Sequence, residues 1–294
     1  MRSEAEMFAL IHNFAGSRED IRAVVMNGSR VNPNAAKDPF QDYDIACYVK
    51  DVDAFRGDLS IPQYFGELMI LQLPDDMGNP EPENNGTYAY LMQFMDGNRI
   101  DLSFHPLESV DTIQQDSLSR VLLDKDKRIA ALPAPSDRGY WPKPPSAKAF
   151  EDCCNEFWWV SVYAAKGLWR GELTYAHSIL DGYVRDQLMK LLTWYFGINT
   201  GFEKSAGKCG KYLKSGLSEA EWQQLEDTYA DSDPEHTWQA LFAMGDLFRQ
   251  TAGRVAQEFG FSYPAKDDER VSAFLRRIHD LSADATELDQ AKKN

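Results

Sequence analysis

Two aspartates one residue apart, Asp42 and Asp44, stand at the head of the short apolar run 45–49. Residues two apart on a strand project to the same face, so both carboxylates should point together from backbone positions about 7 Å apart. Two like charges placed this way are unfavourable unless a cation lies between them. Mg²⁺ would meet this need, because it takes carboxylate oxygens and completes its shell with water and substrate phosphate.

A third carboxylate, Asp101, lies between Ile100 and Leu102 in the apolar segment 99–104, which reads as a neighbouring strand. A single charge in such a segment is as often the solvent-facing side of an amphipathic strand. The three aspartates together point instead to a metal site, and we predict Asp42, Asp44 and Asp101 as its ligands.

The apolar run 21–26 is followed, after Asn27, by Gly28 and Ser29. A strand that ends in Gly-Ser before a helix offers close backbone approach, free N–H groups and a hydroxyl, which are the parts of a phosphate site. The chain contains no Walker loop, and the segment "SAGKCGKYL" lacks both the Walker spacing and a preceding strand. Gly-Ser followed after twelve residues by Asp-x-Asp predicts a phosphate site and a metal site on adjacent strands.

The elements that would position these residues fall into two groups. Apolar periodicity predicts a helix over 3–15, and short β-branched or alternating runs predict strands over 21–26, 45–49, 68–73, 87–95 and 99–104. Asp96-Gly97-Asn98 separates the last two runs and indicates a hairpin. We expect a mixed sheet with helices against one face.

The second half of the chain differs from the first in composition and in its predicted elements. The stretch 132–150 holds five prolines, which indicates a connection between domains, and helices are predicted over 151–168, 176–196, 218–229 and 237–259. Ser218 and Glu221 match a capping box. The expected class is α+β, with a sheet domain at 1–135, a linker at 136–145, an all-α helical bundle at 146–282 and a tail at 283–294.

Composition limits the partners. The chain has 294 residues with 31 Lys+Arg against 46 Asp+Glu, a net charge of −15. This charge disfavours nucleic acid, which binds cationic surfaces, and would attract a cationic small substrate. The sequence shows no long apolar segment and no signal peptide, and its four cysteines lack metal-ligand spacing, so we expect a cytoplasmic protein without membrane association.

The order of apolar strand, Gly28-Ser29, Asp42-x-Asp44 and a later Asp101 resembles the nucleotidyltransferase superfamily of the DNA polymerase beta type. Within it, the segments "NGSRVNP", "DYDIACYV" and "RIDL", with "EFWWVSVYAAKGLWRGELTYA", "LMKLLTWYFG" and "GKCGKYL" later, look like the aminoglycoside 6-adenylyltransferases. The resemblance covers about residues 4–274. It implies Mg²⁺-dependent transfer of AMP from ATP to the 6-hydroxyl of streptomycin with release of pyrophosphate, by a monomer that binds both substrates between a nucleotidyltransferase domain and a helical bundle.

The resemblance also implies roles for single residues. Asp42 and Asp44 would hold Mg²⁺, and Gly28 with Ser29 would bind the β- and γ-phosphates. Arg30 would either pair with these phosphates or form a structural salt bridge. Asp101 would be either the general base for the attacking hydroxyl or a third metal ligand.

In the helical half, the resemblance points to phosphate contacts and to an antibiotic site. The candidate phosphate contacts are Lys166, in the match "AKGL", and more weakly Lys208 and Lys211. Streptomycin carries two guanidinium groups, which bind carboxylates and aromatic faces. The candidate antibiotic contacts are Glu156, Trp158, Trp159 and Asp181, with core packing as the alternative reading of each tryptophan.

Two other functions share the same N-terminal residues. One is a nucleotidyltransferase that acts on another small molecule or on a protein. The other is a non-catalytic nucleotide-binding module. The three clustered carboxylates disfavour this function, because they repel one another and a protein that binds no metal would have no reason to keep them.

Overall fold

The computed structural model describes residues 1–80 and 85–288, and the predicted tail therefore falls partly outside the described residues. The chain divides into two compact units, Met1–Gly139 and Tyr140–Asn294. Among the helices described, none combines the length and apolar character that crossing a membrane requires.

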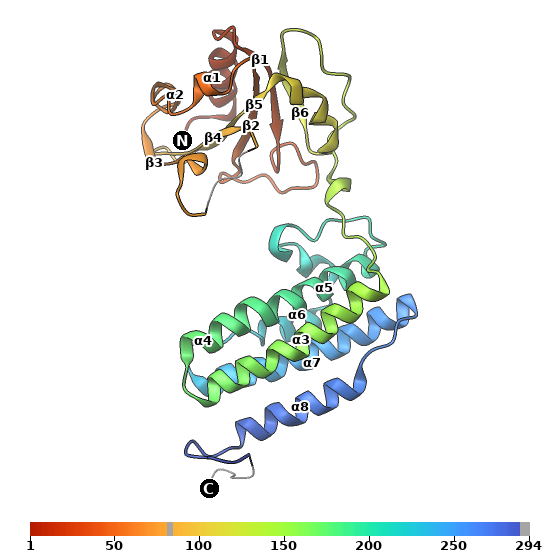
Figure 1. The fold of residues 1–294 in the computed structure, drawn as a ribbon. Coiled ribbons are helices and arrows are strands. Elements are labelled where there is room, and N and C mark those ends of the chain that lie inside the picture. The colour runs from red at the N-terminus through yellow and green to blue at the C-terminus, as the bar shows by residue number, and fades with distance from the viewer. Residues whose placement is uncertain (81–84, 289–294) are drawn as a thin grey trace. The chain divides into compact units, whose positions relative to one another are not determined.

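The first unit is built on a six-stranded mixed sheet with the order β3-β4-β5-β2-β1-β6 (Figure 1). The strands are β1 (Ile21–Asn27), β2 (Tyr43–Val49), β3 (Leu68–Gln72), β4 (Tyr88–Phe94), β5 (Arg99–Pro106) and β6 (Arg120–Asp124). All neighbouring pairs are antiparallel except β2 and β5, which run parallel. The predicted mixed sheet is confirmed, and so is the hairpin at Asp96–Asn98.

The two faces of this sheet differ in their cover. Helices α1 (Glu4–Gly16) and α2 (Ser60–Phe65) bury one face through side chains such as Met7, Phe14 and Phe65. On the opposite face, Val110 and Ile113 of the 3-10 segment Leu107–Gln115 pack against Ala23, Val25 and Tyr48. The α-helices therefore lie against one face, as predicted, and part of the other face is left for polar side chains.

The N-terminus is tied to the sheet by a charged contact. Arg2 donates from its Nε to Asp96 Oδ2 at 2.7 Å and from its backbone N–H to the same oxygen at 2.9 Å. Ser3 and Glu6 form a reciprocal capping box that starts α1. Because Asp96 belongs to the turn between β4 and β5, this contact joins the first helix to the hairpin.

The second unit is helical. Its α-helices are α3 (Ala147–Trp169), α4 (Leu173–Ser178), α5 (Arg185–Asn199), α6 (Glu219–Glu226), α7 (Pro234–Phe259) and α8 (Ala265–His279). Helices α3, α5 and α7 pack on one another, and α8 lies against α3 (Figure 1). Their buried faces share one core in which the rings of Phe157 and Phe248 stack with centroids 3.7 Å apart. The capping box predicted at Ser218 and Glu221 is confirmed.

Several local predictions were wrong. No helix follows the Gly28-Ser29 turn, because the chain passes through further turns and two prolines, Pro33 and Pro39, before β2. The predicted helix 176–196 is interrupted by a π-helical segment, Ile179–Val184, between α4 and α5. Helix α3 begins earlier than expected, because the Ser146 side chain accepts a hydrogen bond from the N–H of Ala149 and caps it. Strand β6 and helices α2 and α8 were not predicted as separate elements.

Candidate active site

The structure places two of the predicted aspartates side by side. Asp44 lies on β2 and Asp101 on β5, and they are register partners in the parallel pairing of these strands. Asp42 directly precedes β2. Because side chains alternate along a strand, Asp44 and Asp101 both project from the sheet face opposite α1 and α2.

A hollow of about 280 Å³ opens on this face of the sheet. It lies over β1, β2, β4 and β5, and both aspartates line it. Its polar lining residues are Asn27, Asp44, Tyr48, Asp101, Ser103 and His105. Asp44 and Asp101 therefore share a recess whose volume lies near the lower end of those typical of small-ligand sites.

Gly28 brings the backbone into contact with Asp44. It follows β1 with a φ of +77°, a conformation that favours glycine, and a Cβ at this position would overlap Oδ2 of Asp44. The turn then closes through hydrogen bonds from the N–H of Val31 to Gly28 O and from the N–H of Asn32 to Ser29 O. The Gly28-Ser29 turn and the aspartate strand are thus adjacent, with Asn27 opposite Asp44 in the β1–β2 register.

The cation beside these carboxylates is an arginine of the same sheet. Arg99 donates from Nε to Oδ1 of Asp101 and from Nη2 to Oδ2, both at 2.8 Å. Its Nε also lies 3.7 Å from Oδ2 of Asp42. In contrast, Asp44 has no hydrogen-bond or ion-pair partner within the described part of the chain. Two of the three carboxylates are thus paired with one guanidinium.

The electrostatics follow from this arrangement. Burial, followed by the charges of Asp101 and Asp42, raises the pKa of Asp44 to about 6. Burial also raises the pKa of Asp42, against the opposing charge of Arg99. The hydrogen bonds to Asp101 in turn raise the pKa of Arg99. Of the three aspartates, Asp44 is therefore the one whose negative charge is least compensated by a nearby cation.

Across residues 1–80 and 85–288, no group of three or more His, Cys, Asp or Glu side chains is arranged to hold a metal ion. Mg²⁺ is usually bound through one or two carboxylates together with substrate phosphates, so it does not require such a group beforehand. Asp44, unpaired and repelled by its neighbours, is a donor that suits a hard divalent cation. These carboxylates are suitable ligands for Mg²⁺. That Asp42, Asp44 and Asp101 all bind the metal ion stays a prediction.

Arg30 has a structural position. Its Nε and Nη2 donate to the carbonyls of Asp42 and Gln41, at 3.2 and 2.6 Å, and its guanidinium lies 3.8 Å from the ring centroid of Tyr43. Nη1 adds an ion pair with Glu4 at 3.4 Å. Of the two roles left open by the sequence, these contacts favour the structural one, which fixes the loop ahead of Asp42.

The predicted lysines all lie in the helical unit. Lys166 is half-buried in the last turn of α3. Lys208 starts the 3-10 segment Lys208–Gly210 and is exposed. Lys211 follows that segment, is also exposed, and places its Nζ 5.0 Å from the ring centroid of Tyr212. Lys208 and Lys211 are thus exposed on this unit, whereas Lys166 is only partly exposed.

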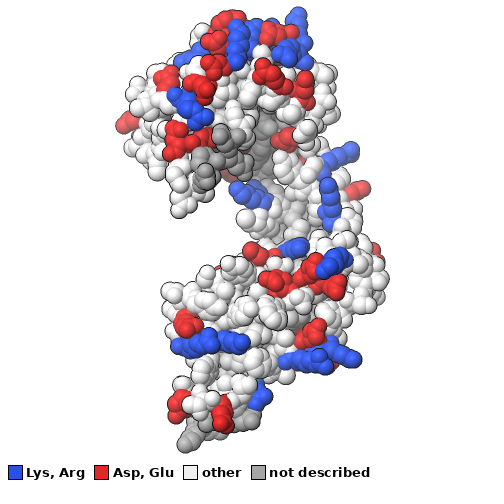
Figure 2. All heavy atoms as spheres, in the orientation of Figure 1, with Lys and Arg blue, Asp and Glu red and all other residues white. Residues whose placement is uncertain are grey.

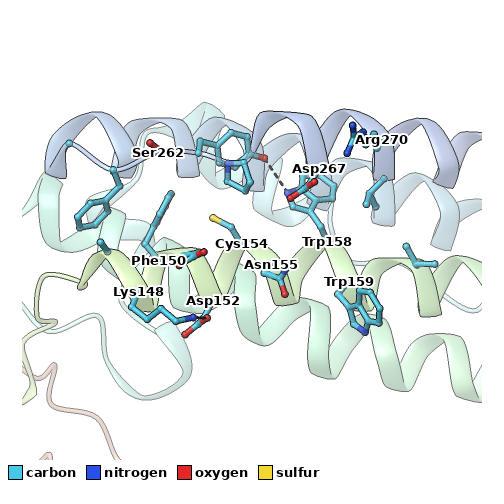
Figure 3. A pocket seen from close by; sticks show the side chains of 18 residues that line it. Lys148, Phe150, Asp152, Cys154, Asn155, Trp158, Trp159, Ser262, Asp267 and Arg270 are labelled. Carbon is cyan, nitrogen blue, oxygen red and sulfur yellow. Dashed lines mark hydrogen bonds and ion pairs between the residues drawn. The ribbon is translucent and has the colours of Figure 1, made fainter.

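The two predicted tryptophans have different environments. Both line a pocket of about 1060 Å³ between α3 and the segment that leads into α8 (Figure 3). Trp158 is only 2% exposed, and its Nε1 donates to the Tyr263 hydroxyl at 3.2 Å. Trp159 is 60% exposed, with its Nε1 bonded to the Tyr163 hydroxyl at 2.8 Å. Trp158 is thus a core residue, whereas the ring of Trp159 is open to solvent.

The two carboxylates predicted for the antibiotic also differ. Glu156 is exposed on α3 and is not among the described residues that line this pocket. Asp181 lies in the π-helical segment, where its Oδ1 accepts from Arg185 at 2.9 Å and its Oδ2 lies 3.1 Å from Nδ1 of His177. Asp181 is therefore committed to structural partners, and Glu156 is free of them in the described part of the chain.

Several residues of the sheet site were not predicted from the sequence. Arg99 and Ser103 each lie two residues from Asp101 on β5, and His105 lies four away, so strand alternation alone places them on its face. His105 stacks on Tyr48 with ring centroids 5.4 Å apart, and its Nε2 lies 2.8 Å from Ser103 Oγ. Asn27 was not predicted as a site residue; it ends β1, and its buried Oδ1 has no partner among the described residues.

Comparison with known proteins identifies the family. The family model described as streptomycin adenylyltransferase matches residues 1–278. Proteins named aminoglycoside 6-adenylyltransferase from Bacillus subtilis and Campylobacter jejuni are each 39% identical, covering 91% and 94% of this chain and 95% and 96% of their own length. The protein of that name from Staphylococcus aureus is 34% identical, covering 95% of this chain and all of its own.

A crystal structure of an aminoglycoside 6-adenyltransferase from Bacillus subtilis is 35% identical, with a TM-score of 0.47, and covers 95% of this chain and 99% of its own. The family model spans nearly the whole chain and includes Gly28, Asp42, Asp44 and Asp101. The chain belongs to the streptomycin adenylyltransferase family, a family of nucleotidyltransferase enzymes.

Proposed function

We propose that this protein transfers AMP from ATP to a hydroxyl of an aminoglycoside, the 6-hydroxyl of streptomycin, and releases pyrophosphate. Membership of the family supports the reaction class. The observation that carries the proposal is the alignment of Asp44 with Asp101 on parallel strands, next to a glycine turn that touches Asp44. This is the pairing of a carboxylate site with a phosphate site that nucleotidyl transfer needs.

In this proposal Asp42, Asp44 and Asp101 hold Mg²⁺, which neutralises charge on the ATP phosphates when it is bound. The Gly28-Ser29 turn contributes backbone N–H groups and a hydroxyl to the β- and γ-phosphates. Asp101 retains its second possible role as general base. Both of its oxygens accept hydrogen bonds from Arg99, so acting as a base would require one of these bonds to be given up.

The proposed contacts with the antibiotic come from helix α3. Glu156 and Trp159 are three residues apart on this helix and both are exposed, so they share a face. A carboxylate beside an indole ring suits a guanidinium group, by a charge-assisted hydrogen bond and by stacking. Trp158 lies in the core and Asp181 is held by Arg185 and His177, so neither carries this part of the proposal. Lys166, Lys208 and Lys211 remain candidate phosphate contacts.

The test is pyrophosphate release from ATP and Mg²⁺ with streptomycin, with spectinomycin and kanamycin for comparison and mass spectrometry of the products. A streptomycin product heavier by one AMP is expected. Release with another compound but not with streptomycin would refute the assignment of streptomycin. No release with any of the three, in a protein that still binds ATP with Mg²⁺, would favour a nucleotidyltransferase with another substrate. Glu156→Gln and Trp159→Ala should raise the KM for streptomycin and leave the KM for ATP unchanged.

A further inference from the structure

Arg99 occupies the position between two carboxylates of the proposed metal site. Its two hydrogen bonds of 2.8 Å engage both oxygens of Asp101, and its Nε is also 3.7 Å from Asp42. Arg99 comes from β5, two residues before Asp101, so strand alternation fixes it on the same face. The protein thus supplies its own positive charge at the place where a cation is needed.

No other described cation is ion-paired with these carboxylates. Arg30 is another arginine whose charge acts on Asp42 and Asp44, but its guanidinium is bound to the carbonyls of Gln41 and Asp42, to Glu4 and to the ring of Tyr43. Arg99 is less constrained, since its side chain is 40% exposed and its polar contacts are those with Asp101 and Asp42. The guanidinium of Arg99 is therefore held by carboxylates, whereas that of Arg30 is also held by backbone carbonyls.

We infer that Arg99 is a stand-in cation, which neutralises Asp101 and Asp42 before a divalent metal ion binds and which the metal must displace or outweigh. The inference rests on the proposed function, because it assumes that the three aspartates bind metal. Its physical basis is that a positive charge within a few ångströms opposes the entry of a second one. Arg99 therefore stabilises the metal-free protein and weakens its affinity for metal.

The test measures Mn²⁺ binding by the full-length protein, by calorimetry and electron paramagnetic resonance, with and without a non-hydrolysable ATP analogue. Arg99→Gln should lower the Kd for Mn²⁺ by about tenfold, because the competing charge is gone. It should also lower the melting temperature of the metal-free protein, and saturating Mn²⁺ should restore it. An unchanged or higher Kd in this variant would overturn the inference.

A matched control is Arg56→Gln. The Arg56 side chain is also 40% exposed and also pairs with two carboxylates, those of Asp53 and Asp76, outside the site. Its loss should leave the Kd for Mn²⁺ unchanged. If Arg99→Gln fails to fold, Arg99→Lys decides the question. A lysine keeps the charge but not the two-pronged geometry, so an affinity close to that of the unmodified protein is expected, and a clear loss would show that Arg99 orients Asp101 instead.

Failure of the metal site itself has a different signature. If neither the unmodified protein nor Arg99→Gln binds Mn²⁺ in the presence of the nucleotide analogue, the metal part of the proposed function is wrong and the inference falls with it. If the unmodified protein binds Mn²⁺ and Arg99→Gln binds it no more tightly, only the inference fails.

Discussion

At the scale of single residues, the surroundings of the Asp44 carboxylate disfavour its charged form and so lower the stability of the fold at neutral pH. Asp44 is half-buried beside two other carboxylates and has no hydrogen-bond or ion-pair partner in the described part of the chain. Its native pKa of about 6 exceeds the ordinary value of 3.8, so the native state binds more protons than the unfolded state between these values. The free energy of unfolding should therefore fall as the pH rises from about 4 to about 6.

Asp44→Asn tests this arrangement. We expect it to abolish AMP transfer, because a ligand of the proposed metal is lost, and to raise the melting temperature of the metal-free protein at pH 7, because a repelled charge is removed. Thermal unfolding measured from pH 4 to 8 should show a flatter profile than that of the unmodified protein. Asp111→Asn, which alters an exposed carboxylate, should change neither property. Retained turnover in Asp44→Asn would refute the assignment.

Gly28→Ala should damage the site and the fold together. The methyl group would overlap Oδ2 of Asp44, and alanine is strained at a φ of +77°. The strain alone costs about 1–2 kcal/mol. Gly57→Ala is the matched control, since Gly57 has a φ of +69° and open space around it. Chemical denaturation should show a larger loss for Gly28→Ala, and turnover should fall only there; equal losses in both would show that the contact with Asp44 is unimportant.

At the scale of elements, the sheet site depends on which strands become neighbours. Local patterns predicted the strand of Asp44, the strand of Asp101 and the hairpin before it, because alternation and turn residues are encoded within a few positions. The parallel pairing of β2 with β5 joins segments distant in sequence, so no local pattern reports it. Arg99 could have been predicted from its spacing to Asp101 alone, but its bond to both oxygens depends on the folded geometry.

The wrong predictions have local causes as well. Gly-Ser after a strand suggested a helix, yet Pro33 and Pro39 in the following segment favour turns. Strand β6 was not predicted because it is only five residues long and mostly half-buried, so its sequence shows no clear alternation of apolar and polar residues. The first error therefore has a local cause, whereas β6 is defined by its pairing with β1 in the sheet.

Helix α8 is held to α7 by a buried carboxylate. Asp268, 3% exposed, accepts from Arg249 at 2.6 and 2.7 Å, from the Tyr263 hydroxyl at 2.7 Å and from Ser272 at 2.9 Å. Asp268→Asn should lower the free energy of unfolding by about 2 kcal/mol, since hydrogen bonds to a charged group are lost. Chemical denaturation measures this. The neighbouring Asp267→Asn alters an exposed residue and should cost a few tenths at most; comparable losses would contradict the role of Asp268.

At the scale of the whole molecule, charge should govern encounter with the substrate. The net charge is −15, and acidic and basic side chains lie intermixed on the faces of both units in view (Figure 2). Attraction of a dicationic substrate by an acidic protein is screened by salt. If streptomycin is the substrate, as proposed, kcat/KM for it should fall about threefold between low and 300 mM KCl while kcat stays constant. Sucrose at matched osmolality should have no effect, and a salt-independent kcat/KM would argue against steering.

The register of Asp44 with Asp101 also bears on how the protein is made. A ribosome releases the segment of Asp44 long before that of Asp101, with the whole β3–β4 region synthesised between them. A nascent chain that ends before β5 lacks the parallel neighbour of β2, the third carboxylate and the arginine that balances it. Contacts between such distant segments form late, because a long loop must close first. ATP should therefore be unable to assist folding before β5 has been synthesised. Binding of ATP by a nascent chain would show that β2 and β5 have already paired.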